Sequence, residues 1–271
     1  MLNACIINCY AGLVLALVKI KAMSQEKSEE LLPGALKILQ SENGYRYSID
    51  PFLLAAFVSL PAGAQVVDLG SGSGVISLLL SQKDPVAKVV GLELQDALVE
   101  RSRHTVALNG FQDRIKIVQG DVRALPASLM PGSFDVVVSN PPYRTAGSGR
   151  LALGDERSRA RHELSGGLVD FLTAASSLLK SGGLFFIVYL AERLPELMAE
   201  MSCLKLEPKR LRMVYSREGG EARLILVEGR KNARKGMKVE SPLIIYKGSG
   251  RDYTDEVLAM YRPTVAAIRN Q

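Results

Sequence analysis

The sequence has few of the residues that bind metal ions. Its 271 residues include three cysteines and two histidines. Cys5, Cys9 and Cys203 lack the spacing of a zinc motif, and His104 and His162 are too few to complete one. We therefore expect no metal site. The sparse use of cysteine favours a reducing compartment, the cytoplasm.

The sequence also lacks internal repeats, low-complexity tracts and the pattern of a secretory signal. Residues 2–18 are largely apolar, but Asn3 and Asn8 interrupt them, and Lys19 and Lys21 follow rather than precede them. A secretory signal has the opposite order, and the stretch is at the short limit for a spanning helix. We interpret residues 1–22 as an over-extended reading-frame start outside the fold, with a membrane anchor as the alternative. A single domain is expected over residues 23–271.

Hydrophobic residues make up 47% of the chain, which at this length predicts one domain with a large core. Short apolar runs alternate with helical segments along most of the sequence. That order predicts the α/β class, with a doubly wound, mainly parallel sheet that binds ligand at the C-terminal ends of its strands. The expected strands are 65–69, 89–93, 115–119, 134–139 and 183–189. The expected helices are one that Asp50 caps and that runs through Val58, one that begins at Val75, and two at 97–109 and 168–180.

The most informative segment is Asn140-Pro141-Pro142-Tyr143, which follows the β-branched run 134–139. Prolines have no N–H and favour extended geometry, so this strand tip offers acceptors rather than donors. The Asn140 side-chain oxygen and the Pro141 carbonyl together can accept both N–H bonds of a substrate amino group. Tyr143 adds a flat face on which a base or an amide can stack. A plain proline loop leaving a strand would have the same sequence.

A glycine-rich loop about 70 residues upstream favours the functional interpretation. Residues 65–69 are expected to form a buried strand, and Gly70, Gly72 and Gly74 precede an apolar helix. Glycines permit a tight turn and let a ligand contact backbone at a helix N-terminus. Glu93 ends the next strand about 20 residues later, at the position that hydrogen-bonds ribose hydroxyls in this architecture. Nicotinamide dinucleotides and S-adenosylmethionine both fit this pattern.

The third strand, 115–119, is followed by Gly120 and Asp121, and this spacing favours S-adenosylmethionine. Asp121 can accept from an adenine amino group, although an exposed loop aspartate needs no such role. With these residues in place, the chain resembles class I S-adenosylmethionine-dependent methyltransferases that act on amino groups. The resemblance implies a Rossmann-like fold and a cofactor loop from Asp68 to Gly74. It further implies that Glu93 binds ribose, that Asp121 lies beside adenine and that Asn140 contributes to the cofactor site.

The flanking segments narrow the resemblance. Residues 38–50, 217–231, 241–246 and 253–257 resemble the bacterial tRNA1(Val) adenine-37 N6-methyltransferase family, and the likeness runs from about Leu31 to Tyr261. It implies a tRNA substrate, S-adenosylmethionine as cofactor and an antiparallel strand near the C-terminus. The tetrapeptide also occurs in glutamine N5-methyltransferases of release factors, but these carry a helical domain before the glycine loop, and only about 40 residues separate Met23 from Gln65. A non-catalytic RNA- or NAD-binding domain is a further alternative.

Positive charge is concentrated near the C-terminal end of the sequence. The net charge is +6, yet residues 205–238 contain eleven basic and four acidic residues, so the remainder is about neutral. A basic surface beside a stacking site is what an RNA substrate requires, although any single lysine is more simply explained as solvated charge. Lys231, Arg234 and Lys235 form the strongest phosphate-binding candidate.

A second basic stretch follows the tetrapeptide directly. It contains glycines and several arginines, so we interpret it as a substrate loop that becomes ordered when RNA binds. Arg144, Arg161 and His162 are its candidate contacts to the anticodon loop, and polar decoration of a helix N-terminus explains His162 equally well. No obligate protein partner is indicated.

Overall fold

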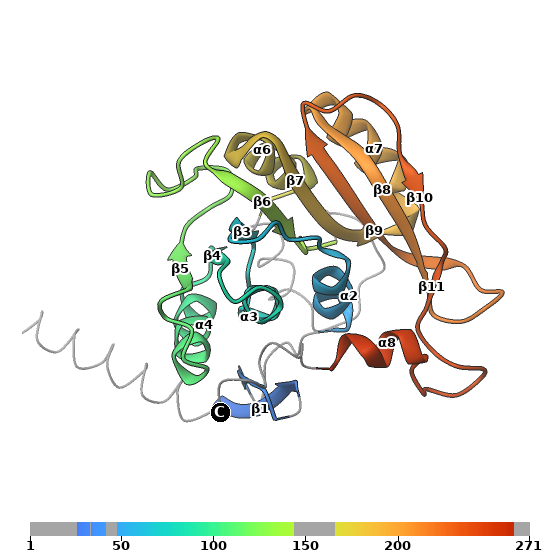
Figure 1. The fold of residues 1–271 in the computed structure, drawn as a ribbon, viewed down its shortest axis with the longest axis horizontal. Coiled ribbons are helices and arrows are strands. Elements are labelled where there is room, and N and C mark those ends of the chain that lie inside the picture. The colour runs from blue at the N-terminus through green and yellow to red at the C-terminus, as the bar shows by residue number, and fades with distance from the viewer. Residues whose placement is uncertain (1–25, 33, 42–47, 144–165, 263–271) are drawn as a thin grey trace, which may run out of the picture.

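A nine-stranded sheet forms the centre of the computed structural model, which describes residues 26–32, 34–41, 48–143 and 166–262 (Figure 1). The strand order is β10-β8-β9-β7-β6-β3-β4-β5, with β11 beside β8. The strands are β3 (Gln65–Leu69), β4 (Lys88–Glu93), β5 (Ile115–Gln119), β6 (Phe134–Ser139), β7 (Leu179–Leu190), β8 (Leu206–Tyr215), β9 (Ala222–Lys231), β10 (Lys238–Val239) and β11 (Leu243–Ile244).

The sheet is mainly parallel, as predicted. β3 to β7 run in one direction, and β9 lies antiparallel between β7 and β8. Five of these strands were expected from their apolar runs. The α/β class and the antiparallel strand near the C-terminus are therefore confirmed.

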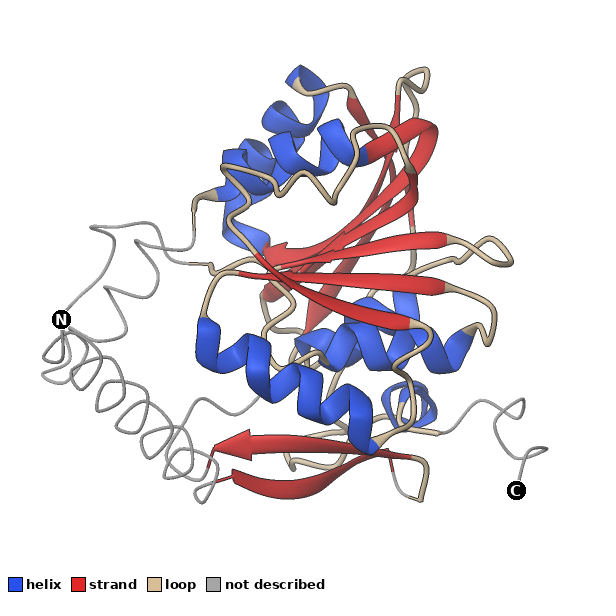
Figure 2. Ribbon diagram, turned by 90° about the vertical axis from the view of Figure 1, so that its left-hand side faces the viewer, coloured by secondary structure: helices blue, strands red, loops and turns tan. Residues whose placement is uncertain are grey.

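Helices cover both faces of the sheet (Figure 2). One face carries α2 (Asp50–Phe57), α3 (Val75–Lys83), α4 (Asp96–Leu108) and α8 (Asp255–Met260); the other carries α6 (Leu168–Leu178) and α7 (Leu194–Cys203), the latter preceded by a short 3-10 turn, η1 (Ala191–Arg193). A hairpin of β1 (Glu26–Leu32) and β2 (Leu36–Ser41) packs against α4. Here the Leu39 amide donates to the Thr105 hydroxyl at 3.2 Å.

The valines of β3 and β6 explain why these segments are strands. Val66 and Val136 face one helical layer, whereas Val67 and Val137 face the other, and all four are fully buried. β-branched side chains fit a pleated surface, and burying each contributes about 1.5–3 kcal/mol. Because both faces are covered, the two strands have no polar side and read as continuous apolar runs.

Three predicted helices differ from the structure by one or two residues at their ends, and the helix expected to run through Val58 ends at Phe57. The helix expected over 168–180 ends at Leu178, and Leu179 already pairs with Phe134 in the sheet. Sheet pairing at this position overrides helix propensity. The helix expected over 97–109 runs from Asp96 to Leu108.

Four stacked aromatic rings join α2 to the C-terminal part of the described chain. Phe52 stacks on Tyr261 with ring centroids 4.3 Å apart. Tyr261 stacks on Tyr253 at 5.8 Å, and Tyr253 stacks on Tyr246 at 5.5 Å. Ring stacking therefore joins α2 to residues about 200 positions further along the sequence.

Within the described ranges, no helix combines the length and apolar character that a membrane crossing requires. The predictions for residues 1–22 concern a segment that lies outside the described residues.

Candidate active site

The glycine loop connects β3 to α3 at the C-terminal edge of the sheet. Gly70, Gly72 and Gly74 have φ values of +72°, +56° and +83°. L-residues with a side chain rarely adopt this conformation, so the turn requires glycine at these points. The Gly70 and Ser71 amides both donate to the Leu92 carbonyl, at 2.8 and 3.0 Å. These bonds fix the loop against the end of β4.

Two further glycines lie beside the loop, where neighbouring atoms leave little room for a side chain. A Cβ atom added at Gly91 would lie 2.8 Å from Ile117 Cδ1 and 2.9 Å from the Ser71 hydroxyl. One added at Gly120 would lie 2.5 Å from Pro126 Cγ. Real Cβ atoms essentially never show contacts this short, so a side chain at Gly120 would collide with the Pro126 ring and one at Gly91 would displace the Ile117 and Ser71 side chains. The close packing holds the ends of β4 and β5 against the loop.

Asp68 is the buried acid that precedes the loop. Its Oδ2 accepts a 2.8 Å hydrogen bond from the Ser77 hydroxyl. Its Oδ1 is buried without a hydrogen-bond partner among the described residues. Burial raises the pKa of Asp68 to about 7, against the opposing effect of the Ser77 hydrogen bonds. An unpaired carboxyl oxygen at this place fits a cationic or hydrogen-bond-donating ligand.

Glu93 ends β4 with its carboxylate turned towards the loop. One oxygen accepts from the Gly72 amide at 3.0 Å, and the other accepts from the Gln95 amide at 2.9 Å. Burial raises the pKa of Glu93, and hydrogen bonds from these amides oppose the shift. Each carboxylate oxygen has capacity for a further donor, so this side chain can bind hydroxyl groups at the sheet edge.

Asp121 lies at the same edge, where the preceding Gly120 amide donates to the Glu93 carbonyl at 2.9 Å. The Asp121 carboxylate is paired with the guanidinium of Arg123, with the shortest contact at 2.6 Å. Hydrogen bonding to Arg123 lowers the pKa of Asp121. An adenine amino group would share this carboxylate with Arg123, a neighbour whose role the sequence did not reveal.

The tetrapeptide begins beside the glycine loop because β6 is the neighbour of β3. Ser139 pairs with Leu69, and its hydroxyl donates to the Leu69 carbonyl at 3.0 Å. Asn140 follows Ser139 as Gly70 follows Leu69, so both segments leave the sheet side by side. Asn140 is half-buried and Pro141 is buried. The acceptors predicted at this tip therefore lie next to the predicted cofactor loop.

Tyr143 is held by contacts at both ends of its side chain. Its hydroxyl oxygen lies 2.7 Å from Asp50 Oδ2 and 2.8 Å from Asn140 Oδ1. Its ring and that of Tyr189 are in edge-to-face contact, with centroids 5.9 Å apart, and its backbone carbonyl accepts from Arg193 at 3.1 Å. The contacts of Asp50, Tyr189 and Arg193 with Tyr143 could not be predicted from the motif, because these residues lie outside it.

The prediction that Asp50 caps α2 was wrong. Ile49 is the N-cap residue, and no side chain forms a cap hydrogen bond there. Asp50 is the first helical residue, followed by Pro51, and its carboxylate contacts Tyr143 instead. Proline favours the first helical turn without any capping side chain, which leaves the Asp50 carboxylate available to the site.

The predicted RNA contacts are only partly described. Arg144, Arg161 and His162 lie outside the described residues. Arg234 and Lys235 are exposed, whereas the Lys231 ammonium donates to the Leu179 carbonyl at 2.7 Å. This loop follows β9, whose end pairs with the beginning of β7. The loop therefore lies at the end of the sheet where β6 and β7 begin, whereas Asn140 lies at the end where β6 finishes. The charge pattern did not predict this separation.

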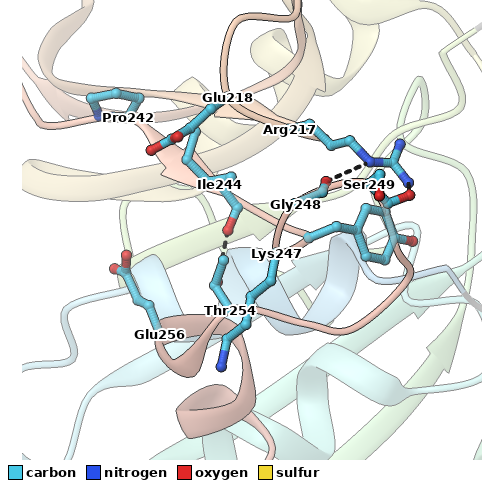
Figure 3. A pocket seen from close by; sticks show the side chains of 10 residues that line it. Arg217, Glu218, Pro242, Ile244, Lys247, Gly248, Ser249, Thr254 and Glu256 are labelled. Atoms are coloured by element: carbon cyan, nitrogen blue, oxygen red, sulfur yellow. Dashed lines mark hydrogen bonds between the residues drawn. The ribbon is translucent and has the colours of Figure 1, made fainter.

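Several other basic residues of the 205–238 segment make structural contacts. Arg210 pairs with Glu228 and Glu240. Arg217 donates to the carbonyls of residues 248–250 and lies over the Tyr246 ring. It also lines a hollow of about 700 Å³ that is lined by none of the predicted catalytic, cofactor or RNA-binding residues (Figure 3). Glu218 and Glu256 balance Arg217 and Lys247 there, so its charge favours no anion.

The described part of the chain contains no cluster of three or more acidic, histidine or cysteine side chains that could hold a metal ion. The geometry instead combines a glycine-lined turn, a carboxylate bonded to that turn and a strand tip rich in acceptors at one end of the sheet. This combination is the one predicted for a methyltransferase.

Comparison with known proteins gives the same class. Residues 50–202 match the family model described as methyltransferase small domain. A predicted O-methyltransferase from Agrobacterium tumefaciens has the same fold, with a TM-score of 0.64 and 23% sequence identity over 78% of this chain and 95% of that chain. Likeness at this identity establishes the fold alone.

Sequence relatives define the family more narrowly. A tRNA1(Val) (adenine(37)-N6)-methyltransferase from Porphyromonas gingivalis is 32% identical over 226 residues, which are 80% of this chain and 88% of the relative. One from Bacteroides thetaiotaomicron is 32% identical over 180 residues, 66% of this chain and 73% of the relative. The chain belongs to the tRNA1(Val) (adenine(37)-N6)-methyltransferase family. The resemblance seen in the sequence is thus confirmed.

Proposed function

We propose that the protein transfers the methyl group of S-adenosylmethionine to N6 of adenine 37 in a valine tRNA. One observation carries the proposal: the acceptors of Asn140 and Pro141 leave the sheet directly beside the glycine loop, because Ser139 and Leu69 are paired neighbours. An amino group held by the first is brought close to a cofactor held by the second.

The residues at the loop fit S-adenosylmethionine. Glu93 has acceptor capacity for the ribose hydroxyls, and the glycines allow close approach to backbone. The buried, unpartnered Oδ1 of Asp68 fits a donor or a positive charge on the methionine part of the molecule. Asp121 is the candidate for the adenine amino group. When bound, S-adenosylmethionine supplies an electrophilic methyl group on a sulfonium.

The tetrapeptide supplies the chemistry on the acceptor side. The lone pair of an adenine amino group is delocalised into the ring, which makes the nitrogen a poor nucleophile. Asn140 and Pro141 each accept a hydrogen bond from one of its two N–H groups. This favours a pyramidal nitrogen and directs the lone pair at the methyl group. Methyl transfer would form the N–C bond and break the C–S bond, leaving the cofactor as a neutral thioether, and the nitrogen would release one proton to water. No strong base is needed before transfer.

The target base must leave its stack to reach this site. Unstacking costs a few kcal/mol, and stacking on the Tyr143 ring offsets part of that cost. The Tyr189 ring packs against the Tyr143 ring, and Arg193 donates to the Tyr143 backbone carbonyl, so both contacts restrict the position of Tyr143. The same residues would suit a planar amide, so the choice of base depends on the rest of the substrate.

Two observations support RNA as that substrate. The relatives named above act, by name, on adenine 37 of tRNA1(Val). The exposed Arg234 and Lys235, at the opposite edge of the sheet, suit the phosphates of a nucleic acid large enough to extend across the molecule. A tRNA meets this requirement, and it is available in the cytoplasm, the compartment that we propose.

The direct test uses unmodified transcripts. Purified protein is incubated with methyl-labelled S-adenosylmethionine and a valine tRNA transcript, and the nucleosides are analysed by mass spectrometry. We expect N6-methyladenosine from the transcript and none from a matched transcript with guanosine at position 37. In cells, tRNA from a deletion strain should lack the same nucleoside.

A parallel reaction contains a release-factor peptide with a glutamine substrate. Label on the peptide and none on any tRNA would replace the proposal with glutamine N5-methylation. The absence of label from both, with S-adenosylmethionine bound, would indicate a non-catalytic binding domain.

A further inference from the structure

The hydroxyl group of Tyr143 lies between two side chains that would both accept its proton. Asp50 Oδ2 is 2.7 Å from the hydroxyl oxygen, and Asn140 Oδ1 is 2.8 Å from it. A hydroxyl carries a single proton, and an ionised carboxylate can only accept. The two hydrogen bonds therefore compete for one donor unless one partner presents a donor of its own.

Asn140 can present that donor, because its amide has an NH2 group as well as an oxygen. Rotation of the amide by 180° exchanges the two ends with almost no change in shape. In the rotated form, the Asn140 NH2 donates to the Tyr143 oxygen and the Tyr143 proton goes to Asp50. Every partner is then satisfied, and the Tyr143–Asp50 bond is charge-assisted.

We propose that Asp50 is a positioning residue, which acts through Tyr143 to set the orientation of the Asn140 amide. The rotated amide directs its oxygen away from Tyr143 and towards the substrate. The opposite orientation would present NH2 to the substrate amino group, donor against donor. This inference rests on the proposed function, because only a substrate amine requires an acceptor here.

Asp50 is well placed for such a role. It is 9% exposed and is fixed in the first turn of α2 by the neighbouring Pro51. The next residue, Phe52, belongs to the aromatic stack with Tyr261. The start of α2 is thereby held in place. The Asp50 carboxylate contacts Tyr143, which lies 93 positions later in the sequence. A mobile surface acid could not impose an orientation in this way.

The amide orientation can be observed directly by NMR in the wild-type protein. If Asp50 orients the Asn140 amide through Tyr143 as proposed, the two side-chain amide protons of Asn140 lie next to the Tyr143 hydroxyl and its ring ε protons. We expect nuclear Overhauser effects between them. Clear Asn140 amide signals with no such effect would place the oxygen, not the NH2, beside Tyr143 and overturn the proposal.

Kinetics of variants test the role of the orientation. Tyr143→Phe retains the ring but loses the hydroxyl, so kcat for methyl transfer should fall on the order of tenfold, the scale of one lost hydrogen bond. KM for tRNA and S-adenosylmethionine affinity should stay within about twofold. Asp50→Asn should reduce kcat similarly, and the double variant should be no slower than Tyr143→Phe alone.

Asp96→Asn is the matched control, because Asp96 occupies the first turn of α4 as Asp50 does in α2. A merely structural role of Asp50 predicts a different pattern: Asp50→Asn would lower the melting temperature and further reduce activity in the Tyr143→Phe background. Multiplying effects in the double variant would overturn the proposal.

The inference and the proposed function can be disproved independently of each other. If tRNA is methylated and the Asn140 amide has the opposite orientation, the inference fails and the function stands. If the wild-type protein methylates a glutamine peptide instead, the function fails, and the same variants are measured on that peptide. The NMR result holds whatever the substrate, and it does not depend on variants that fail to fold.

Discussion

Ser139 and Leu69 lie side by side at the ends of β6 and β3, and the Ser139 hydroxyl donates to the Leu69 carbonyl at 3.0 Å. The contact joins two segments that are 70 positions apart in sequence. Each residue is followed directly by a segment of the candidate site, the tetrapeptide after Ser139 and the glycine loop after Leu69. The bond thus fixes the position of one segment relative to the other, and a serine can be buried there because its hydroxyl has a partner.

Replacing Asn140 by alanine should abolish methyl transfer. The variant loses the side-chain acceptor for the target amine, while the residues that fit S-adenosylmethionine at the loop are unchanged. We expect S-adenosylmethionine affinity, measured by calorimetry, to stay within a few-fold. Substantial turnover on tRNA in this variant would disprove the acceptor mechanism.

Replacing Glu93 by alanine should weaken S-adenosylmethionine binding by roughly 1.5–3 kcal/mol, the scale of hydrogen bonds to a charged group. Calorimetry measures the change directly. Glu93→Gln separates binding from folding, because it still offers an acceptor to the Gly72 amide but carries no charge. The control is Glu100→Ala, which changes a partly exposed residue of α4 paired with Arg103. Equal affinities for the Glu93 and Glu100 variants would mean that Glu93 is not the ribose acid.

Replacing Lys231, Arg234 and Lys235 by alanine should weaken tRNA binding and leave S-adenosylmethionine binding unchanged. If each contacts one phosphate, the log–log dependence of affinity on salt should flatten by a slope of roughly 2–3. Because the Lys231 ammonium is bonded to the Leu179 carbonyl, Arg234 and Lys235 alone would account for roughly 1.5–2. Filter binding over a range of salt concentrations measures the slope.

A second triple variant controls for the loss of charge. Lys27, Lys37 and Lys116 are exposed and lie away from β9, so their replacement removes the same net charge from another surface. Equal slopes for the two variants would show that the loop has no special role, and the phosphate contacts would then be sought among the arginines that follow Tyr143.

The stability of the cofactor-free protein should fall as pH rises from about 4 to about 7. Asp68 has a pKa of about 7 in the folded protein and near 3.8 when unfolded. The folded state therefore binds more protons in this window, and its stabilisation by the neutral acid is lost as pH passes the folded pKa. The difference amounts to at most about 4 kcal/mol.

Asp68→Asn should flatten this dependence, because an amide does not titrate. Denaturant unfolding at several pH values measures the effect. The Glu93 pKa is raised in the same direction, so part of the slope should persist in the variant. An unchanged slope would mean that Asp68 is ionised throughout the window.

The central part of the fold could be predicted because its signals are local. β3, β5 and β6 have the bounds expected from the sequence. β3 and β6 lie inside the sheet, where covered faces favour apolar residues, whereas β5 is an outer strand in which buried and exposed residues largely alternate. The glycine loop and the tetrapeptide were visible for a similar reason: backbone conformation and missing N–H groups belong to the residues themselves.

The rest of the site depends on contacts between distant segments. Asp50 looked like a helix cap because an acid before proline usually is one, and its partner Tyr143 lies 93 positions away. Arg123 competes for Asp121 through a loop that no periodicity describes. The position of the basic loop follows from the direction of β9. Because β9 runs antiparallel to β7, it ends where the parallel strands begin.

The aromatic stack of Phe52, Tyr261, Tyr253 and Tyr246 has a consequence for synthesis of the protein. A growing chain has both functional segments once Tyr143 has left the ribosome, but the rings that anchor α2 are added more than 100 residues later. The nascent chain therefore carries its cofactor loop before the support for Asp50 exists. Completion of the site coincides with release of nearly the whole chain, so a prematurely terminated product would retain the cofactor loop without its supported partner.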